Sequence, residues 1–286
     1  MNSLIKSPFN YIGGKYKLLP QLLTLFPTNI NNFYDVFGGG GSVSLNVNAK
    51  HIHYNDIIPH ISDVFKSIKN MSAEDCVSEI KSTIDYYNLS KTNEEGFKKL
   101  RSDYNNGDKS WVKFYTLMCY SFNSQFRFNN NQEYNSSFGR YKSCFSNVTE
   151  DKVVKCIERL NEIDIKFTNN DFMDLDFSKL DNQDFVYFDP PYLITCGNYN
   201  DGKRGFKGWT KEDDESLMSL CDMLNKKGIK FALSNVLEHK GKTNEILKEW
   251  SKKYNVVHLN NSYENCNYHA KDKSKNSTDE VLIINY

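Results

Sequence analysis

This sequence has no long apolar run, no leader-like start and no internal repeat, and these absences exclude several classes of protein. None of its apolar segments approaches the ~20 residues that a helix needs to cross a bilayer. The first residues, MNSLIKSPFN, hold no continuous apolar stretch like that of a signal peptide. Of the 286 residues, 39% are hydrophobic and 25% charged, which is typical of a soluble globular protein. We therefore expect a cytoplasmic protein without membrane contact.

Paired cysteines are also absent. The seven cysteines are scattered, none forms a C-x-x-C pair, and their number is odd. This argues against a disulfide framework and against a zinc knuckle, so reduced thiols are the simplest account. His51 and His53 alternate and would share one face of a strand, but the histidines have no acidic or cysteine partner at ligand spacing. We expect no metal site.

The chain has no net charge, and its pI is about 7.0. This counts against a nucleic-acid binder, because such domains are often basic. The charge is uneven, however: acidic residues crowd 74–95 and 150–184, and basic residues prevail in 109–142, 203–211 and 226–242. A balanced total can hide a basic face, although solvated helix surfaces explain any single cluster as well.

Strand patterns alternate with helix patterns along most of the chain. Strands are expected at 32–37, 51–55, 164–168, 185–188, 229–234, 256–259 and 281–285. Helices are expected at 57–68, 76–87, 111–120, 211–227 and 244–253, and a further helix over Ser42–Ala49 with Ser42 as N-cap. Thr210 and Asp213 have capping-box spacing, and Gly228 would end that helix. The alternation predicts an α/β fold with a mostly parallel sheet covered on both faces, and an antiparallel pair at the edge, because no helix joins the last two strands.

Two polar turns follow the first two expected strands. Asp35-Val36-Phe37 leads into the glycine run Gly38–Gly41, where a ligand could approach the backbone closely. Asn55-Asp56 ends the next strand, where an acidic residue can hold ribose hydroxyls. A tight turn explains the glycine run equally well, and an Asp after a strand is by itself more often a helix cap.

A third turn, Asp189-Pro190-Pro191-Tyr192, follows the apolar strand 185–188. Two prolines make the backbone rigid and remove two donors, which leaves carbonyls and a carboxylate as acceptors. The tyrosine offers a flat face for stacking. This set suits a planar base with an amino group, which would donate to Asp189 and to the carbonyl of Pro190.

Together these motifs resemble the Dam-type (class alpha) DNA adenine-N6 methyltransferases, which include methyltransferases of restriction–modification systems. The matching pieces occur in the family's order: Tyr11–Lys15, Asp35–Gly41, Asn55-Asp56, Phe122–Asn129, Glu133–Asn135, Gly139–Tyr141, Asn170–Phe172 and Asp189–Tyr192. The C-terminal third, with Thr195, Tyr199, Asn200, Asn235 and 263–268, looks closer to the adenine methyltransferases of short-site restriction systems than to Dam itself.

The resemblance implies a doubly wound, Rossmann-like fold that uses S-adenosylmethionine. Residues 1–70 and 145–286 would form the catalytic domain, and 71–144 an inserted, mainly helical target-recognition subdomain with a β-hairpin at about 122–142. The cofactor pocket would be lined by Tyr11, Lys15, Asp35, Phe37, Gly38, Asp56, Ile57, Asp171 and Phe172. Asp56 would take the ribose hydroxyls, and Asp171 would accept from the adenine of the cofactor, with Phe172 against the ring. Without the family, a helix-capping Asp171 and a core Phe172 would be the simpler interpretation.

The resemblance also implies that the hairpin reads DNA. The residues that would contact DNA are Asn123, Gln125, Arg127, Asn129, Ser137 and Arg140. Arg127 can donate two hydrogen bonds to a guanine in the major groove, while Arg140 suits phosphate. Gln125 and Ser137 depart from the leucine and proline usual in the Dam pattern. A GATC target is therefore in doubt, and we expect a site that contains GAT.

The expected activity is methyl transfer to an adenine that has left the helix, catalysed by Asp189, Pro190, Pro191 and Tyr192 without a metal. Double-stranded DNA would be the substrate, a restriction endonuclease a functional partner, the source a bacterium or phage, and the protein a monomer. Two alternatives remain open. One keeps the fold and changes the acceptor to a cytosine amino group, an RNA adenine or a protein glutamine amide. The other is a sequence-specific DNA-binding module without turnover.

Overall fold

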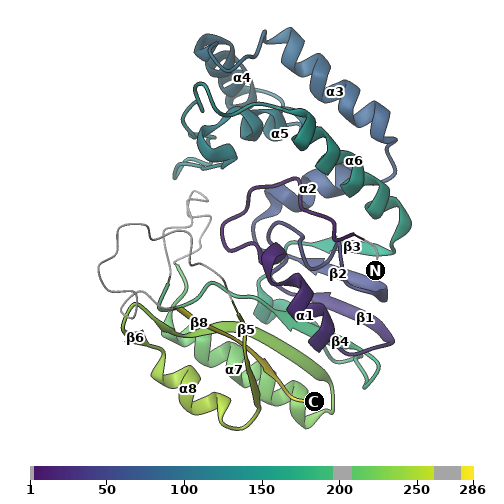
Figure 1. The fold of residues 1–286 in the computed structure, drawn as a ribbon, viewed down its shortest axis with the longest axis vertical. Helices are drawn as coiled ribbons and strands as arrows, with labels where there is room; N and C mark the ends of the chain where they lie inside the picture. The colour runs from purple at the N-terminus through teal and green to yellow at the C-terminus, as the bar shows by residue number, and fades with distance from the viewer. Residues whose placement is uncertain (1–2, 196–207, 261–277) are drawn as a thin grey trace.

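The central feature of the computed structural model is a twisted, mostly parallel sheet (Figure 1). The structure describes residues 3–195, 208–260 and 278–286, so the motif residues Tyr199, Asn200 and 263–268, and the basic residues of 203–207, lie outside it. Within the described residues, the strand order is β3-β2-β1-β4-β5-β8-β7, and β6 (Lys242–Thr243) pairs with β5. The parallel strands are β1 (Ile30–Asp35), β2 (Ala49–Asn55), β3 (Ile165–Thr168), β4 (Phe185–Phe188) and β5 (Lys230–His239).

The predicted antiparallel pair is confirmed at the sheet edge. β8 (Thr278–Ile284) runs antiparallel to β5 on one side and to β7 (Asn255–His258) on the other. From β1, the chain therefore adds β2 and then β3 on one side of this strand. It then crosses back and adds β4 and β5 on the other side of β1. The point where the strand order reverses lies between β1 and β4, and ligands of open α/β sheets bind at the carboxyl ends of strands at such a point.

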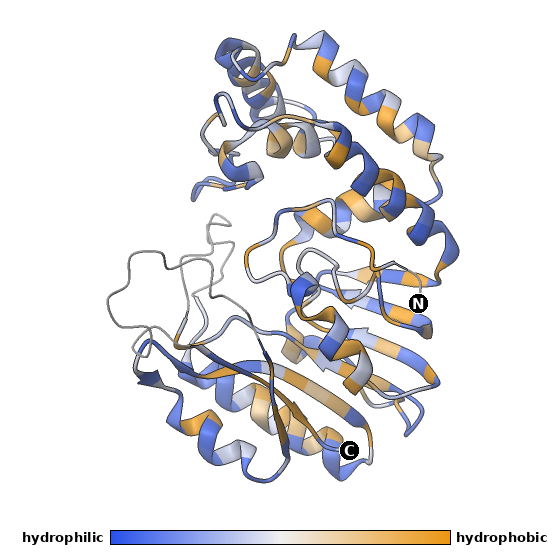
Figure 2. Cartoon of the chain, in the orientation of Figure 1, coloured by the Kyte–Doolittle hydropathy of each residue, from blue (hydrophilic) through white to orange (hydrophobic). Residues whose placement is uncertain are grey.

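Two separate apolar cores lie on the two faces of the sheet. Phe185 and Tyr187 of β4 join one core, whereas Val186 and Phe188 join the other, because side chains alternate between the faces of a sheet. α1 (Leu19–Leu25) and α2 (Pro59–Ile68) cover the first face, and α7 (Lys211–Lys226) and α8 (Glu245–Ser251) the second. Figure 2 shows the long strands β5 and β8 as largely hydrophobic, and α7 and α8 beside them with many hydrophilic residues. The α/β class with both faces covered is thereby confirmed.

Helix α7 begins and ends as its sequence predicts. The Thr210 hydroxyl accepts from the backbone N–H of Asp213, and the Asp213 carboxylate accepts from the backbone N–H of Thr210, which completes a capping box. Gly228 follows with a φ of +71°, the left-handed conformation that glycine adopts without strain.

The helix expected over Ser42–Ala49 is wrong. The segment forms a tight turn, with hydrogen bonds from the N–H of Leu45 to the Gly41 carbonyl and from that of Val47 to the Val43 carbonyl. Too few residues separate Gly41 from the start of β2 at Ala49 for a longer helix, and Val43, Leu45 and Val47 are all buried rather than on one face.

Four helices lie together at the top of the view in Figure 1: α3 (Ala73–Tyr86), α4 (Glu94–Asn106), α5 (Trp111–Tyr120) and α6 (Asn147–Glu162). The sequence patterns predicted α3 and α5 but neither α4 nor α6. α4 is mostly charged and polar, so its narrow buried stripe of Phe97, Leu100 and Tyr104 is easily overlooked. Beyond α5 the chain folds back on itself through isolated antiparallel bridges, Ser121 with Phe138 and Phe128 with Tyr134. Among the described residues, no helix is long and apolar enough to cross a membrane.

Candidate functional site

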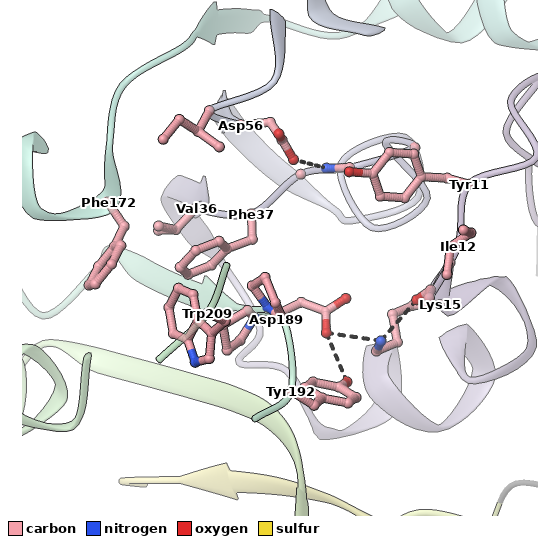
Figure 3. Close-up of a pocket in the computed structure, with 18 of the residues that line it drawn as sticks. Tyr11, Ile12, Lys15, Val36, Phe37, Asp56, Phe172, Asp189, Tyr192 and Trp209 are labelled. Carbon is pink, nitrogen blue, oxygen red and sulfur yellow. Dashed lines mark hydrogen bonds and ion pairs between the residues drawn. The ribbon is translucent and has the colours of Figure 1, made fainter. Parts of the chain in front are cut away.

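A cavity of about 660 Å³ opens at the carboxyl ends of β1, β2 and β4, where the strand order reverses (Figure 3). That volume lies in the range of cavities that hold a drug-sized ligand, about 300–1,000 Å³. The cavity brings together all the residues that the sequence predicted for cofactor and catalysis: Tyr11, Lys15, Asp35, Phe37, Gly38, Asp56, Ile57, Asp171, Phe172, Asp189, Pro190, Pro191 and Tyr192. Residues up to 181 positions apart in the chain thus share one space (192 − 11).

The glycine turn after β1 packs too tightly to carry side chains. A Cβ on Gly38 would lie 2.2 Å from the Tyr54 ring, far inside van der Waals contact. Gly39 has a φ of +48°, and a Cβ there would lie 2.9 Å from the Tyr11 ring. The Tyr54 hydroxyl donates to the Gly39 carbonyl at 2.6 Å, and this hydrogen bond stabilises the turn. The bare backbone therefore forms one wall of the cavity.

Backbone N–H groups donate to both carboxylate oxygens of Asp56 and hold this side chain in place. Its Oδ2 accepts from the N–H of Gly39 at 2.8 Å, and its Oδ1 from that of Ile58 at 2.9 Å. These bonds tie the end of β2 to the glycine turn, as Figure 3 shows. Each carboxylate oxygen has more than one lone pair, so further donors from a ligand can still be accepted.

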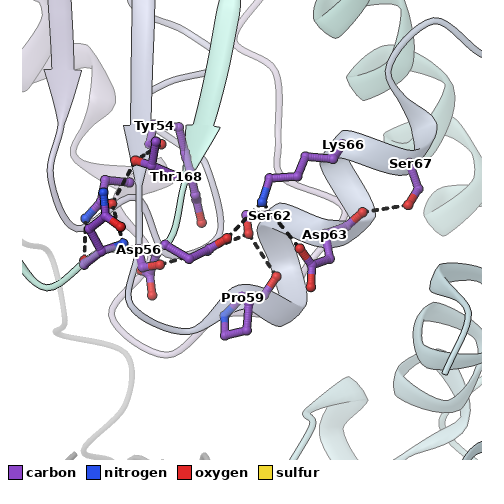
Figure 4. Close-up of polar contacts among 11 residues, drawn as sticks. Tyr54, Asp56, Pro59, Ser62, Asp63, Lys66, Ser67 and Thr168 are labelled. Carbon is purple, nitrogen blue, oxygen red and sulfur yellow. Dashed lines mark hydrogen bonds and ion pairs between the residues drawn. The ribbon is translucent and has the colours of Figure 1, made fainter.

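A second layer of polar contacts supports the Asp56 backbone (Figure 4). The Asn169 amide donates to the Asp56 carbonyl at 2.9 Å and to the Ser62 hydroxyl at 2.7 Å, and Lys66 donates to Asn169 at 2.8 Å. One strand away, the Thr168 hydroxyl donates to the Asn55 side chain at 2.8 Å. These bonds join the ends of β2 and β3 to α2, which makes the position of Asp56 rigid.

Asp189 lies at the centre of a charged cluster at the end of β4. Its Oδ1 is 2.9 Å from Lys15 Nζ and accepts from the Tyr192 hydroxyl at 2.9 Å. Among the described residues, no donor reaches its Oδ2. Lys15 is almost fully buried and comes from the short 3-10 helix η1 (Lys15–Lys17). One oxygen of the carboxylate is thus anchored, while the other is available on a rigid proline turn.

Burial dominates the electrostatics of the cavity. It raises the pKa of Asp189, and the nearby Lys15 ammonium and the Tyr192 hydroxyl oppose that rise. Burial also raises the pKa of Asp35 to about 7, although the Ser44 hydroxyl donates to its Oδ2 at 2.6 Å. The Oδ1 of Asp35 is buried and has no hydrogen-bond partner among the described residues. A buried oxygen without a partner in a cavity wall is suited to a donor from a ligand.

Three aromatic rings lie on the side of the cavity away from Tyr11 and Lys15 (Figure 3). The rings of Phe37 and Phe172 have centroids 5.5 Å apart, and Trp209 lies 5.6 Å from Phe37 and 5.5 Å from Phe172. The Trp209 indole donates to Asp214 at 2.6 Å, and Asp214 also accepts from Asn244. This apolar wall suits the face of a planar, ring-shaped ligand.

The interpretation of Asp171 as a cap is also correct. Its side chain accepts from the N–H of Met173 at the start of the 3-10 helix η3 (Phe172–Asp174). Asp171 is exposed and Phe172 buried, and both face the cavity. The structural and the binding interpretation are therefore compatible for this pair.

The residues predicted to read DNA lie away from the cavity, in the folded-back segment after α5. Asn123, Arg127 and Ser137 are exposed, and the Arg127 guanidinium has no hydrogen bond or ion pair within the part of the chain that the structure describes. Arg140, by contrast, pairs with Glu94 of α4. The remaining two, Gln125 and Asn129, are half-buried.

The loop before η1 touches both the cavity and the folded-back segment. The Asn10 amide donates to the Asn123 carbonyl at 2.7 Å, and the Tyr11 ring lies 6.4 Å from that of Phe126, next to Arg127. Phe126 belongs to an aromatic group with Phe114, Phe128 and His60, the last from α2. The loop of Asn10 and Tyr11 therefore connects the cavity to the segment predicted to read DNA.

Trp209 and Glu280 are among the residues of the site that were not predicted from the sequence. Trp209 directly precedes the N-cap of α7, and Glu280 lies on β8 with its carboxylate in the charged cluster. Glu280 could have been noticed because it is a charged residue directly before the apolar run Val281–Ile284. Trp209 carries no such signal.

The comparisons with known proteins agree with this geometry. Residues 11–265 match the family model described as D12 class N6 adenine-specific DNA methyltransferase. The chain is 51% identical over 285 residues to the type II methyltransferase M.FokI of Planomicrobium okeanokoites, and 47% identical over 284 residues to the modification methylase StsI of Streptococcus sanguinis. Each match covers at least 99% of this chain but 43% of the relative, so the chain spans less than half the length of both. A DNA adenine methylase of Haemophilus influenzae is 28% identical over 197 residues, which are 65% of this chain and 63% of that relative.

Proposed function

This chain belongs to the D12 class of N6 adenine-specific DNA methyltransferases, and from that premise we propose that it methylates the N6 amino group of an adenine in double-stranded DNA with S-adenosylmethionine as the donor. The observation that carries the proposal is the shared cavity. The glycine turn, Asp56 and the carboxylate of Asp189 face one space at the point where the strand order reverses.

The residues of the cavity fit S-adenosylmethionine, because they offer hydrogen-bond acceptors for its amine and hydroxyl groups. Asp35 has a buried oxygen without a partner among the described residues, which suits a ligand amine or hydroxyl. Asp56 would take the ribose hydroxyls, and Phe37 and Phe172 would pack against the adenine ring. When bound, the cofactor supplies a methyl group already activated by a sulfonium, so the chain mainly has to align it.

The target adenine has to leave the helix, because its amino group is not accessible to the site inside the stack. Tyr192 offers a ring for stacking, and Asp189 Oδ2 and the Pro190 carbonyl offer acceptors for the two N–H groups of the amine. An amine that donates both hydrogens to acceptors becomes more tetrahedral and exposes its lone pair. Asp189 must be ionised to accept well, and the Lys15 ammonium at 2.9 Å favours that state.

The direct test is methyl transfer by the chain itself. Duplex DNA is incubated with the chain and tritiated S-adenosylmethionine, then digested and analysed for N6-methyladenine and N4-methylcytosine. Label in N6-methyladenine supports the proposal. Label in methylcytosine, in RNA or in protein, or cofactor and DNA binding without transfer, would replace it with one of the alternatives.

Replacing Asp56 should weaken cofactor binding. Hydrogen bonds to a charged group contribute about 1.5–3 kcal/mol, so Asp56→Asn and Asp56→Ala should raise the Kd about 10-fold to 100-fold. Titration calorimetry with S-adenosylhomocysteine measures the change, and thermal unfolding without ligand checks the fold. Asp63→Ala, on the exposed side of α2, is the matched control. Wild-type affinity in Asp56→Asn would exclude this role.

Replacing Arg127 should relax sequence preference. A bidentate contact to guanine contributes about 1–3 kcal/mol of discrimination, so Arg127→Ala should lose about 10-fold or more of the preference at one base pair. Long-read sequencing of modified bases in treated DNA measures it. The exposed Lys142 serves as the comparison, because a phosphate contact would weaken methylation at all sites alike. An unchanged methylation pattern in Arg127→Ala would refute the assignment.

The proposal also covers the recognition site, the division into domains and the biological setting. The folded-back segment, with Asn123, Gln125, Arg127, Asn129, Ser137 and Arg140, would read a short site that contains GAT. Residues 71–144 would form the target-recognition subdomain on a catalytic domain of 1–70 and 145–286. The names of the relatives support a place in a restriction–modification system with a paired endonuclease.

A further inference from the structure

Glu280 connects a distant strand to the centre of the site. Its Oε1 lies 3.6 Å from Lys15 Nζ and accepts from the Tyr192 hydroxyl at 3.3 Å. Lys15 and Tyr192 are the same two groups that hold Asp189 Oδ1. We infer that Glu280 is a positioning residue that sets the orientation of Asp189 and Tyr192 through these shared partners. The inference rests on the proposed function, because it concerns the groups that would receive the target base.

The position of Glu280 requires an explanation beyond strand formation. It is only 5% exposed, on a strand whose next four residues are apolar and buried or nearly so. A buried carboxylate costs several kcal/mol of desolvation unless it is paired, so a residue of this kind is retained for a contact that it makes. Its backbone carbonyl accepts from Leu259, which keeps it in register with the sheet, while its side chain turns to the cavity.

Among the described residues, the carboxylates of Asp189 and Glu280 both lie beside the Lys15 ammonium. Burial raises the pKa of Glu280, Lys15 opposes the rise, and the charge of Asp189 adds to it. Among the described residues, the other titratable groups around the pair are Tyr192, Tyr187 of β4 and Asp35 of β1. Asp279, the neighbour of Glu280, pairs with His258 of β7 and lies outside the cluster. The Lys15 ammonium is therefore shared, and its hold on Asp189 depends on the charge of Glu280.

Two consequences follow for the proposed reaction. First, the Tyr192 hydroxyl is held between two carboxylates, so the position of its ring is constrained before a base arrives. Second, a neutral residue at 280 would remove one of the two carboxylates that the described residues place beside Lys15. Removing a nearby negative charge favours the ionised form of Asp189 and lowers its pKa.

The test compares Glu280→Gln and Glu280→Ala with the matched control Asp279→Asn, which removes one negative charge at the adjacent position. We measure kcat for methyl transfer against pH, the Kd of S-adenosylhomocysteine and thermal unfolding. Glu280→Gln should move the acidic limb of kcat to lower pH, because a neutral side chain beside Asp189 no longer opposes its ionisation. Glu280→Ala should lower kcat about 10-fold to 100-fold, because a misplaced acceptor and ring cost catalysis. Cofactor Kd should change by less than about threefold in both, and Asp279→Asn should behave as wild type.

Fluorescence of DNA with 2-aminopurine at the target position gives a readout that does not require turnover. Glu280→Ala should bind this DNA but give a different emission from wild type, because the stacking ring is no longer fixed. A wild-type pH profile in Glu280→Gln together with wild-type emission in Glu280→Ala would overturn the inference. So would an equal shift in Asp279→Asn. Failure of the proposed function is distinct, because wild-type chain would then transfer no methyl to adenine at all.

Discussion

Asp189→Ala should abolish methyl transfer while cofactor binding stays close to wild type. The carboxylate is the charged acceptor of the rigid turn, and its Oδ2 has no partner among the described residues, so the neutral Pro190 carbonyl beside it cannot take over its role. Loss of a preorganised group that contacts the reacting atoms typically lowers kcat about 100-fold to 1,000-fold, and an unassisted amine is a weak nucleophile. We therefore expect a fall of at least about a thousandfold, measured as tritium transfer to duplex DNA.

The companion variant Asp189→Asn separates charge from shape. Its carbonyl oxygen can still accept one hydrogen bond, but Lys15 then loses its nearest anion, and Glu280 is the carboxylate that remains beside it among the described residues. We expect a loss of activity nearly as large as that of the alanine variant. Calorimetry with S-adenosylhomocysteine provides the control for folding. A kcat within about tenfold of wild type in Asp189→Ala would refute the role that we assign to this residue.

Lys15→Met should be the most destabilising change in the site. It leaves the carboxylates of Asp189 and Glu280 buried without their ammonium, and removal of one partner of a buried ion pair costs about 3–5 kcal/mol. Methionine keeps the length and apolar stem of the side chain, so the loss reports mainly on charge. Urea unfolding of the free chain measures the free energy of unfolding.

The pH dependence of this loss has a definite sign. Without Lys15, the pKa values of Asp189 and Glu280 rise further above their ordinary range, because burial is no longer opposed. The folded variant then binds protons more tightly than the unfolded chain, so its stability increases as the pH falls. The deficit relative to wild type should be largest near about pH 8 and shrink toward about pH 5. The acidic limb of kcat should move to higher pH, opposite to Glu280→Gln. A deficit that does not vary with pH would contradict the charge argument.

Local sequence was a good guide wherever local interactions decide the structure. The capping box of Thr210 and Asp213 and the left-handed Gly228 follow from residues a few positions apart, and both ends of α7 were predicted to within a residue. The helix expected after Ser42 failed because its length is limited by β2, which begins at Ala49. α4 was missed because its polar sequence becomes helical with only a narrow face to bury.

The same distinction between local and long-range interactions applies to the site. The sequence by itself determined which chemical groups exist and the order in which they follow strands: the glycine turn, Asp56, the proline turn of Asp189 and the class of fold that presents them. It could do so because strand ends of a parallel sheet share one edge. Only the tertiary structure decided that Lys15 pairs with Asp189, that Trp209 closes the aromatic wall, and that Glu280 enters from an antiparallel strand 88 residues beyond Tyr192. Such contacts depend on the strand order and on which face each side chain occupies, and no short-range pattern records either.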